Sequence, residues 1–184
     1  MRVCLAPMLS YQQFPLGFSV KRIYIARDPK NEDRKAIIMF RRLASTSASW
    51  ATIPLRLAMG VIFIAHGAGK VLGSFGGPGL RAFASFPAPF PFMRPAWLWM
   101  GAAALSEFIG GILILLGLLT RLGAFLIACT MLTAMIGVHW KNGFFLNPTT
   151  PGIEYTVALL GGALSLLISG GGPASVDRFI SRRR

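Results

Sequence analysis

Six ionisable side chains lie inside, or at the ends of, long apolar runs of this sequence. At the centre of a membrane helix such a group costs about 2.5–3.5 kcal/mol on insertion scales, so it needs a partner or a task. Carboxylates, ammonium groups and imidazoles in an apolar setting can hold a polar ligand or exchange protons. The six form the candidate site, with no catalytic role assigned to any of them: Arg56, His66, Lys70, Glu107, His139 and Glu154.

Three of these side chains share one face of the first apolar run. If residues 53–72 form a helix, Arg56 and Lys70 are separated by about 40° around its axis, and His66 lies about 40° further round. Lipid cannot satisfy these groups, so this face is predicted to turn toward other helices.

Glu107 lies near the middle of the second apolar run and needs a cationic partner there. His66 is the expected partner from its depth along the first run, with Arg56 as the competing one. His139 and Glu154 come at the ends of two later runs, at the same membrane boundary. The arrangement predicts a polar pocket in the outer half of the membrane, ringed by aromatic residues. It would bind a small molecule or a quinone, or exchange protons; the alternative is a set of salt bridges and interface anchors.

The composition places these groups in a membrane. Among the 184 residues, 54% are hydrophobic and 14% are charged, whereas a soluble domain carries about 25% charged residues. So much apolar surface cannot be hidden in one small core, and disorder requires low hydrophobicity. A soluble enzyme, a soluble nucleic-acid binder and a disordered chain are therefore excluded, despite the net charge of +13.

Four apolar windows are long enough to cross a bilayer, which takes about 20 residues. They cover approximately residues 53–72, 96–119, 122–140 and 153–169. Clusters of Gly and Pro separate the first from the second and the third from the fourth. The sequence therefore predicts an all-α membrane protein, with a four-transmembrane-helix bundle over residues 51–170.

Basic residues predict the orientation of this domain, because cytoplasmic loops are enriched in Lys and Arg. Fifteen Lys and Arg lie on the side of the two tails, residues 1–50 and 171–184, against four on the other side. Both termini are therefore predicted to lie in the cytoplasm, with the chain in the inner (plasma) membrane of a bacterial cell. The first tail is predicted to be partly disordered, or to include an extension of residues 1–38 ahead of a true start at Met39.

Other site chemistries have weaker support in the sequence. No Glu-x-x-His pair suits a carboxylate-bridged metal site, so no metal is expected. The two histidines lie at different depths, which disfavours a haem clamped between them. The small residues of the last run are spaced as small-xxx-small and indicate close helix packing, with the face of a homo-oligomer as the alternative.

Three stretches together resemble the DoxX family of small bacterial four-helix membrane proteins. The first run has Arg, Gly and then His-Gly-x-x-Lys. The second has Glu-x-x-Gly-Gly ahead of Leu-Gly-Leu-x-Thr-Arg, and the last has Glu-Tyr before an apolar run with a Gly-rich exit. The resemblance covers residues 52–178, and the first 50 residues have no counterpart.

This resemblance implies a link to redox chemistry in the membrane. Members resemble the small membrane subunit of a thiosulfate:quinone oxidoreductase, and others are associated with membrane complexes that handle thiol and oxidative stress. The polar positions of the family fall here at Arg56, His66, Lys70, Glu107 and Glu154. Neither cysteine suits a thiosulfate site, so the chain is not expected to be an enzyme by itself.

Three functions remain open as alternatives. The first is a redox-linked membrane subunit that holds a quinone, the candidate cofactor, near His66 and Glu107. The second is a non-enzymatic anchor or scaffold for a soluble partner. The third is a carrier of protons or small solutes, which the lack of an evident inverted repeat disfavours. The expected partners are the lipid bilayer and a soluble or membrane redox subunit, with no nucleic acid.

Overall fold

The computed structural model describes residues 38–39 and 46–182. Within these ranges the chain is helical, with no β-strand and an isolated bridge between Leu146 and Pro151. The predicted extension ahead of Met39 and most of the basic first tail lie outside the described residues. The account below concerns residues 46–182, which belong to one compact unit of the chain.

Three helical segments are long and apolar enough to cross a membrane. They are α2 (Thr52–Leu72), α4 (Ala96–Leu116) and a third segment, Thr120–Asn142. The third begins as α5 (Thr120–Ala134) and continues through a π-helical turn and a 3₁₀ turn. Three of the four predicted spans are therefore confirmed as helices of sufficient length and hydropathy.

The fourth predicted span is a shorter apolar helix. This helix, α6 (Glu154–Ser169), has 16 residues. Two further helices are shorter still: α3 (Gly79–Ala84) follows α2, and α7 (Val176–Arg182) follows α6. Proline and glycine clusters lie between these elements, which explains why no long helix continues through them.

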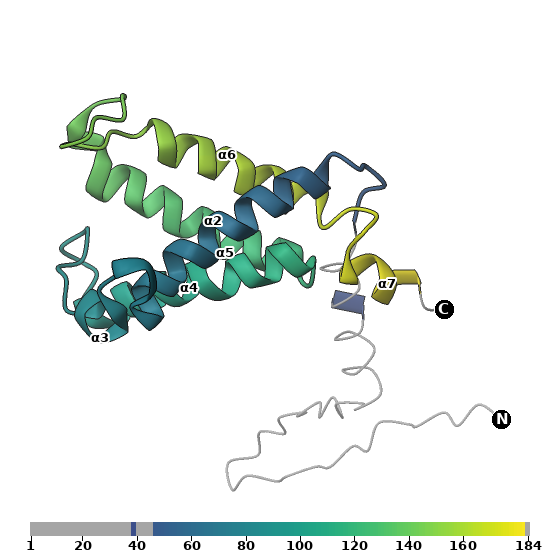
Figure 1. Ribbon diagram of the computed structural model, residues 1–184, viewed down its shortest axis with the longest axis horizontal. Helices are drawn as coiled ribbons and strands as arrows, with labels where there is room; N and C mark the ends of the chain where they lie inside the picture. Colours follow the sequence, from purple (N-terminus) through teal and green to yellow (C-terminus); the bar gives the residue numbers. More distant parts are fainter. Residues whose placement is uncertain (1–37, 40–45, 183–184) are drawn as a thin grey trace, which may run out of the picture. The chain divides into compact units, whose positions relative to one another are not determined.

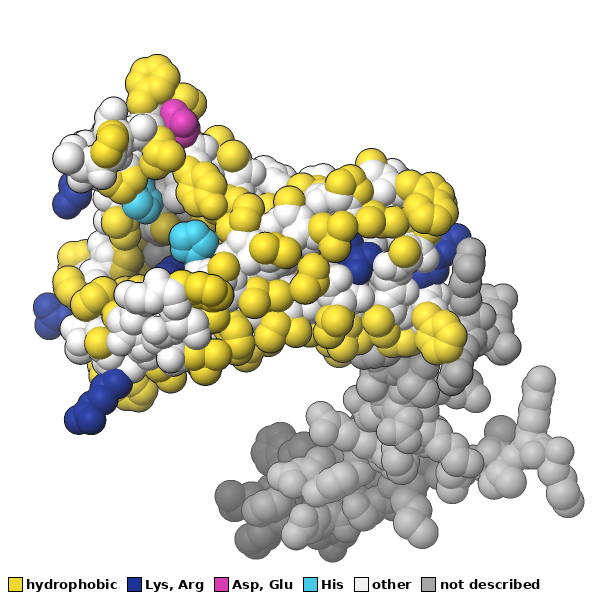
Figure 2. All heavy atoms as spheres, viewed as in Figure 1, with side chains coloured by type: hydrophobic (Ala, Val, Ile, Leu, Met, Phe, Trp, Pro, Cys, Tyr) yellow, Lys and Arg dark blue, Asp and Glu magenta, His cyan; other side chains and the backbone are white. Residues whose placement is uncertain are grey.

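The four apolar helices pack around a shared core (Figure 1). Helix α2 lies along α4, α4 along α5, and α5 along α6, while α6 also contacts α2. The core consists of apolar side chains from all four helices, among them Met59, Phe63, Ile114, Ile127 and Leu166. In the view of Figure 2 the outer surface is mainly hydrophobic, and Lys and Arg lie mostly toward its two ends. This distribution suits helices that are surrounded by lipid.

Glycines let the helices approach closely. A Cβ at Gly67 of α2 would lie 2.5 Å from the Phe108 Cα of α4, and a Cβ at Gly162 of α6 would lie 2.8 Å from the Met59 Sδ. The predicted packing role of small residues is therefore confirmed at Gly162. Gly161 has no atom within 4 Å of its would-be Cβ, so it does not take part in this packing.

The two ends of the helices differ in what they contain (Figure 1). The cavity end holds the C-terminus of α2, helix α3 and the loop of residues 143–153. The hairpin end holds the turn between α4 and α5, and helix α7. The six predicted site residues divide between these two ends.

Candidate functional site

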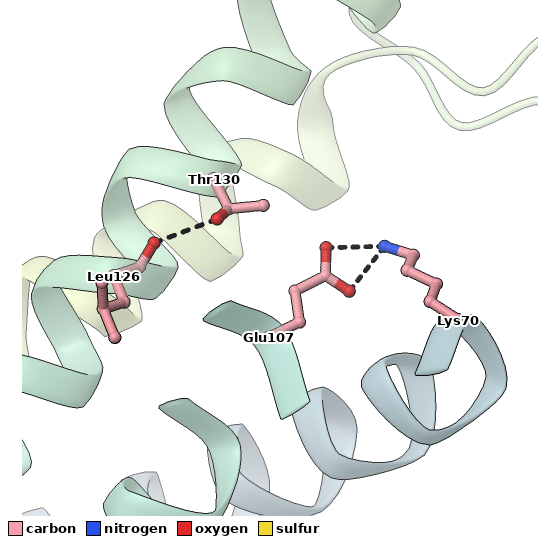
Figure 3. A network of polar contacts seen from close by, with 4 residues as sticks. All are labelled: Lys70, Glu107, Leu126 and Thr130. Carbon is pink, nitrogen blue, oxygen red and sulfur yellow. Dashed lines mark hydrogen bonds and ion pairs between the residues drawn. The ribbon is translucent and has the colours of Figure 1, made fainter. Parts of the chain in front are cut away.

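Lys70 and Glu107 form an ion pair between α2 and α4 (Figure 3). The Lys70 Nζ lies 2.6 Å from the Glu107 Oε1 and 2.5 Å from the Oε2. The Glu107 side chain is 3% exposed and the Lys70 side chain 25%, so the carboxylate is the deeper partner. Charge-assisted hydrogen bonds of this kind are stronger than neutral ones. The pair places a strongly polar group, with no net charge, inside an apolar domain.

The close contact between α2 and α4 brings these two side chains together. Gly67 touches the backbone of Phe108, the residue that follows Glu107. Lys70 comes about one helical turn after Gly67, so its side chain starts near the same level of α4. The Lys70 Nζ also lies 5.2 Å from the centre of the Phe83 ring of α3, within reach of a cation–π interaction.

A cavity of about 630 Å³ lies beside the ion pair. Helices α4 and α5 and the segment of residues 83–93 form its walls. Most of the lining is apolar or aromatic, with Phe83, Phe86, Met93, Trp99, Met100 and Phe125 as the largest side chains. Small-molecule sites typically have this size and a few polar groups on mainly apolar walls.

The polar lining of the cavity is sparse and comes from several helices. Besides Lys70 and Glu107, it consists of Ser106, Cys129, Thr130, Thr133 and His139. The Thr130 hydroxyl donates to the Leu126 carbonyl at 3.0 Å, so its own oxygen is left as an acceptor (Figure 3). The cavity can therefore hold an apolar molecule and orient it through a small number of hydrogen bonds.

The prediction that Glu107 pairs with His66 or Arg56 is wrong, because its partner is Lys70. In the described part of the chain, no ion pair or hydrogen bond joins Glu107 to His66 or to Arg56. His66 is exposed and lines a second hollow of about 350 Å³, which Lys70 also borders, together with residues that follow α2, such as Ser74 and Phe75. The reason is the rotation of α2: the face nearest to Glu107 is that of Lys70, and His66 lies further round the helix.

Arg56 lies at the hairpin end, outside the cavity. The distance of 14 residues from Lys70 corresponds to about 21 Å along α2. Its buried guanidinium donates to four carbonyl oxygens at 2.7–2.9 Å: those of Ile114, Leu115, Gly171 and Ala174. The last carbonyls of a helix lack partners within that helix. Arg56 therefore satisfies the C-terminus of α4 and fixes the chain that leaves α6.

Asp177 of α7 is a buried acidic residue that the sequence analysis missed. Its carboxylate accepts hydrogen bonds from the Leu119 N–H at 2.7 Å, the Thr120 N–H at 2.9 Å and the Thr120 hydroxyl at 2.8 Å. It thus caps the N-terminus of α5, where backbone N–H groups lack helical partners and favour an anion. The only signal in the sequence was a single acidic residue inside a basic tail.

His139 and Glu154 both lie at the cavity end, in different settings. His139 lines the cavity, and its Nδ1 is 3.0 Å from the Pro151 carbonyl oxygen. A carbonyl only accepts, so Nδ1 carries the hydrogen and Nε2 of the neutral ring is an acceptor. Glu154 opens α6, where a negative charge suits the helix dipole, and it is not among the residues that line the cavity.

The six predicted residues therefore separate into three groups. The structure brings Lys70, Glu107 and His139 to one cavity, and it leaves His66 and Glu154 outside its lining at the same end. Arg56 belongs to the hairpin end. Among the described residues, no group of three His, Cys, Asp or Glu side chains could hold a metal ion.

A set of apolar helices with a buried ion pair beside a cavity defines a class of integral membrane proteins with several spans. The chain belongs to the DoxX family, whose pattern it matches over residues 51–140. The matched segment contains Arg56, Lys70 and Glu107. It ends before Asp177, so the cap on α5 comes from outside it.

Two relatives are similar in sequence to this chain over most of their own length. The first, named "Putative oxidoreductase CatD", is from Bacillus subtilis (strain 168) and is 30% identical over 135 residues, which are 70% of this chain and 86% of that protein. The second, named "Inner membrane protein YqjF", is from Escherichia coli (strain K12) and is 32% identical over 129 residues, which are 70% of this chain and 90% of that protein. No solved structure matches the chain significantly.

Proposed function

We propose that this chain is a four-span protein of the bacterial inner membrane that binds a quinone and serves as the membrane subunit of a redox system. The quinone ring occupies the cavity beside Lys70 and Glu107. A soluble or membrane redox subunit supplies the other substrate, so the chain contributes a binding site and not a complete enzyme. The observation that carries this proposal is the mainly apolar cavity, lined in part by aromatic side chains, with a buried ion pair in its wall.

The chemistry of the lining suits a quinone and its reduced form. A Lys ammonium has three N–H donors, and the bonds to the Glu107 carboxylate leave one for a quinone carbonyl. The carboxylate can accept a hydrogen bond from the hydroxyl of a quinol. Aromatic and methionine side chains pack well against a flat ring. Because the pair has no net charge, an uncharged ligand needs no counterion.

The proposed topology has both termini in the cytoplasm and the cavity in the outer half of the membrane. It rests on the excess of Lys and Arg on the side of the two tails, where Arg56 and Arg121 bring the count to fifteen against four. Helix α6, with 16 residues, is about 24 Å long and shorter than the hydrocarbon core of about 30 Å. A short span of this kind can be accommodated by local thinning of the bilayer. The name of the E. coli relative supports the inner membrane.

Binding of decyl-ubiquinone to the full chain in lipid nanodiscs tests the proposal. Trp99 lines the cavity, so a bound quinone should quench its fluorescence saturably. Replacing both partners, Lys70→Met with Glu107→Leu, should weaken binding by about tenfold or more, which corresponds to about 1.4 kcal/mol. The matched control is Lys141→Gln, since Lys141 is an exposed cation at the same end. Saturable binding that the double variant leaves unchanged would refute the assignment of the site.

The first alternative is a membrane anchor or scaffold without a ligand. The hydrogen bonds of Arg56 and Asp177 favour it, because their partners among the described residues are backbone groups and the Thr120 hydroxyl. It predicts no quinone binding and normal assembly with a soluble partner in the double variant. The second alternative, a carrier of protons or small solutes, predicts flux in proteoliposomes without any redox partner.

A further inference from the structure

The cavity beside Lys70 and Glu107 has residues of both α4 and α5 in its walls. Near the hairpin end α4 and α5 touch, because a Cβ at Gly110 would lie 3.1 Å from the Gly123 carbonyl oxygen. Toward the cavity end both helices contribute lining residues, so the space between them is open there. The tight turn at one end and the cavity at the other leave a gap on the flank of the domain.

Four residues border this gap on the outside. They line the cavity and are also exposed: Trp99 and Ala102 from α4, and Phe125 and Cys129 from α5. Their spacings of three and four residues place each pair on one helical face. Cys129 comes nine residues after the start of α5, about 14 Å along a segment of 23 residues, and so lies near the middle of the span. At that depth the surroundings are acyl chains.

We infer that the cavity is entered sideways from the bilayer, through a lateral portal formed by Trp99, Ala102, Phe125 and Cys129. Its ligand is then an uncharged, lipid-soluble molecule with oxygen atoms that form hydrogen bonds. The inference rests on the proposed function only in that a quinone is one molecule of this class. The competing route is entry of a water-soluble solute at the cavity end, past His139.

The charges of the site favour the lipid route. The portal residues carry no charge, and Lys70 and Glu107 neutralise each other inside. A charged solute would lose its hydration on entering and would find no free countercharge, which is costly in an apolar cavity. An uncharged molecule that is already dissolved in lipid has no such barrier.

Spin labels on the full chain in liposomes test the route. One nitroxide is attached to Cys129 after Cys4→Ser, which removes the other cysteine. A second protein carries the label at Phe125→Cys, with Cys4→Ser and Cys129→Ser, so that the test does not depend on one position. Collisions with oxygen, which is concentrated in lipid, are compared with collisions with the polar nickel complex NiEDDA. The lipid-facing control is Leu132→Cys, which is exposed on α5 and does not line the cavity.

The inference expects oxygen collisions to exceed NiEDDA collisions several-fold at both portal positions, as at the control. NiEDDA collisions equal to those of oxygen would overturn it, because the cavity would then open to water. Low collision rates with both reagents would also overturn it, because protein, such as a second copy of the chain, would then cover the gap.

Added decyl-ubiquinone separates this inference from the proposed function. A bound quinone should reduce oxygen collisions at Cys129 and leave Leu132→Cys unchanged. Ala102→Trp, which narrows the portal, should slow that change several-fold, whereas Leu105→Trp, at an exposed position away from the cavity, should not. If the collision pattern is as expected but added quinone does not change the collisions at Cys129, the lateral portal is supported and the assignment of a quinone as the ligand fails. If Ala102→Trp leaves the rate unchanged, the portal is not the route.

Discussion

Breaking the ion pair between Lys70 and Glu107 should destabilise the protein asymmetrically. Removing one partner of a buried pair costs about 3–5 kcal/mol when the other is left charged and unpaired. Lys70→Met leaves the Glu107 carboxylate without its partner, and because this side chain is only 3% exposed, a loss of about 3–5 kcal/mol in the free energy of unfolding is expected. Glu107→Gln strands the ammonium, whose side chain is 25% exposed on a flexible stem. That group can turn toward the aqueous boundary, so about 1–3 kcal/mol is expected.

The double variant Lys70→Met with Glu107→Leu should recover most of this loss. Apolar residues of similar volume often replace a buried pair at little or no cost in stability. The expected free energy of unfolding of the double variant is within about 1 kcal/mol of that of the native protein. The sum of the losses in the two single variants should therefore be much larger than the loss in the double variant. This non-additivity is the coupling that a double-mutant cycle measures.

SDS titration in mixed micelles, followed by tryptophan fluorescence, gives the four free energies of unfolding. Lys141→Gln serves as the control and should change stability by less than about 0.5 kcal/mol, because Lys141 is an exposed surface cation. Additive effects would show that the pair is not coupled in the membrane. A larger loss for Glu107→Gln than for Lys70→Met would refute the argument that the carboxylate is the deeper partner.

Three further substitutions test the packing and the hairpin end, with the same measurement of unfolding. Arg56→Lys should cost about 2 kcal/mol or more, because an ammonium cannot reach four carbonyls and leaves some of them unsatisfied; a neutral effect would contradict this. Asp177→Ala should cost about 2 kcal/mol through loss of the cap on α5, and Asp177→Asn should cost less. Gly67→Ala should cost about 1–3 kcal/mol and weaken quinone binding, whereas Gly161→Ala, in open space, should change neither.

The helices could be predicted from the sequence because the bilayer imposes one requirement on every span. A chain in lipid must satisfy its backbone within each helix, and about 20 apolar residues are needed to cross. Three predicted spans accordingly agree with α2, α4 and the segment from Thr120 to Asn142. The fourth window, residues 153–169, also coincides with a helix, α6, but its 16 residues are fewer than the roughly 20 that a span takes.

The pairing of charges could not be predicted, because it depends on how the helices rotate against each other. Helical periodicity correctly placed Lys70 and His66 within about 40° of one another, on one side of α2. It could not decide which face meets α4. That choice is made by the contact of Gly67 with Phe108, and one small residue among many carries no distinctive signal in the sequence. Asp177 was missed for a related reason, since its partner Thr120 is 57 residues away.

The partners of each polar group separate structural from functional positions more clearly than depth does. At the hairpin end the buried Arg56 and Asp177 bind mainly backbone groups that helix ends leave unsatisfied, so a ligand would have to break the fold to reach them. At the cavity end Lys70 and Glu107 bind each other through side chains that can move, beside a space that holds no packed residues. A ligand can share those hydrogen bonds without disturbing any helix. A polar group in an apolar span is therefore a better candidate for function when its partner is another side chain at a cavity wall.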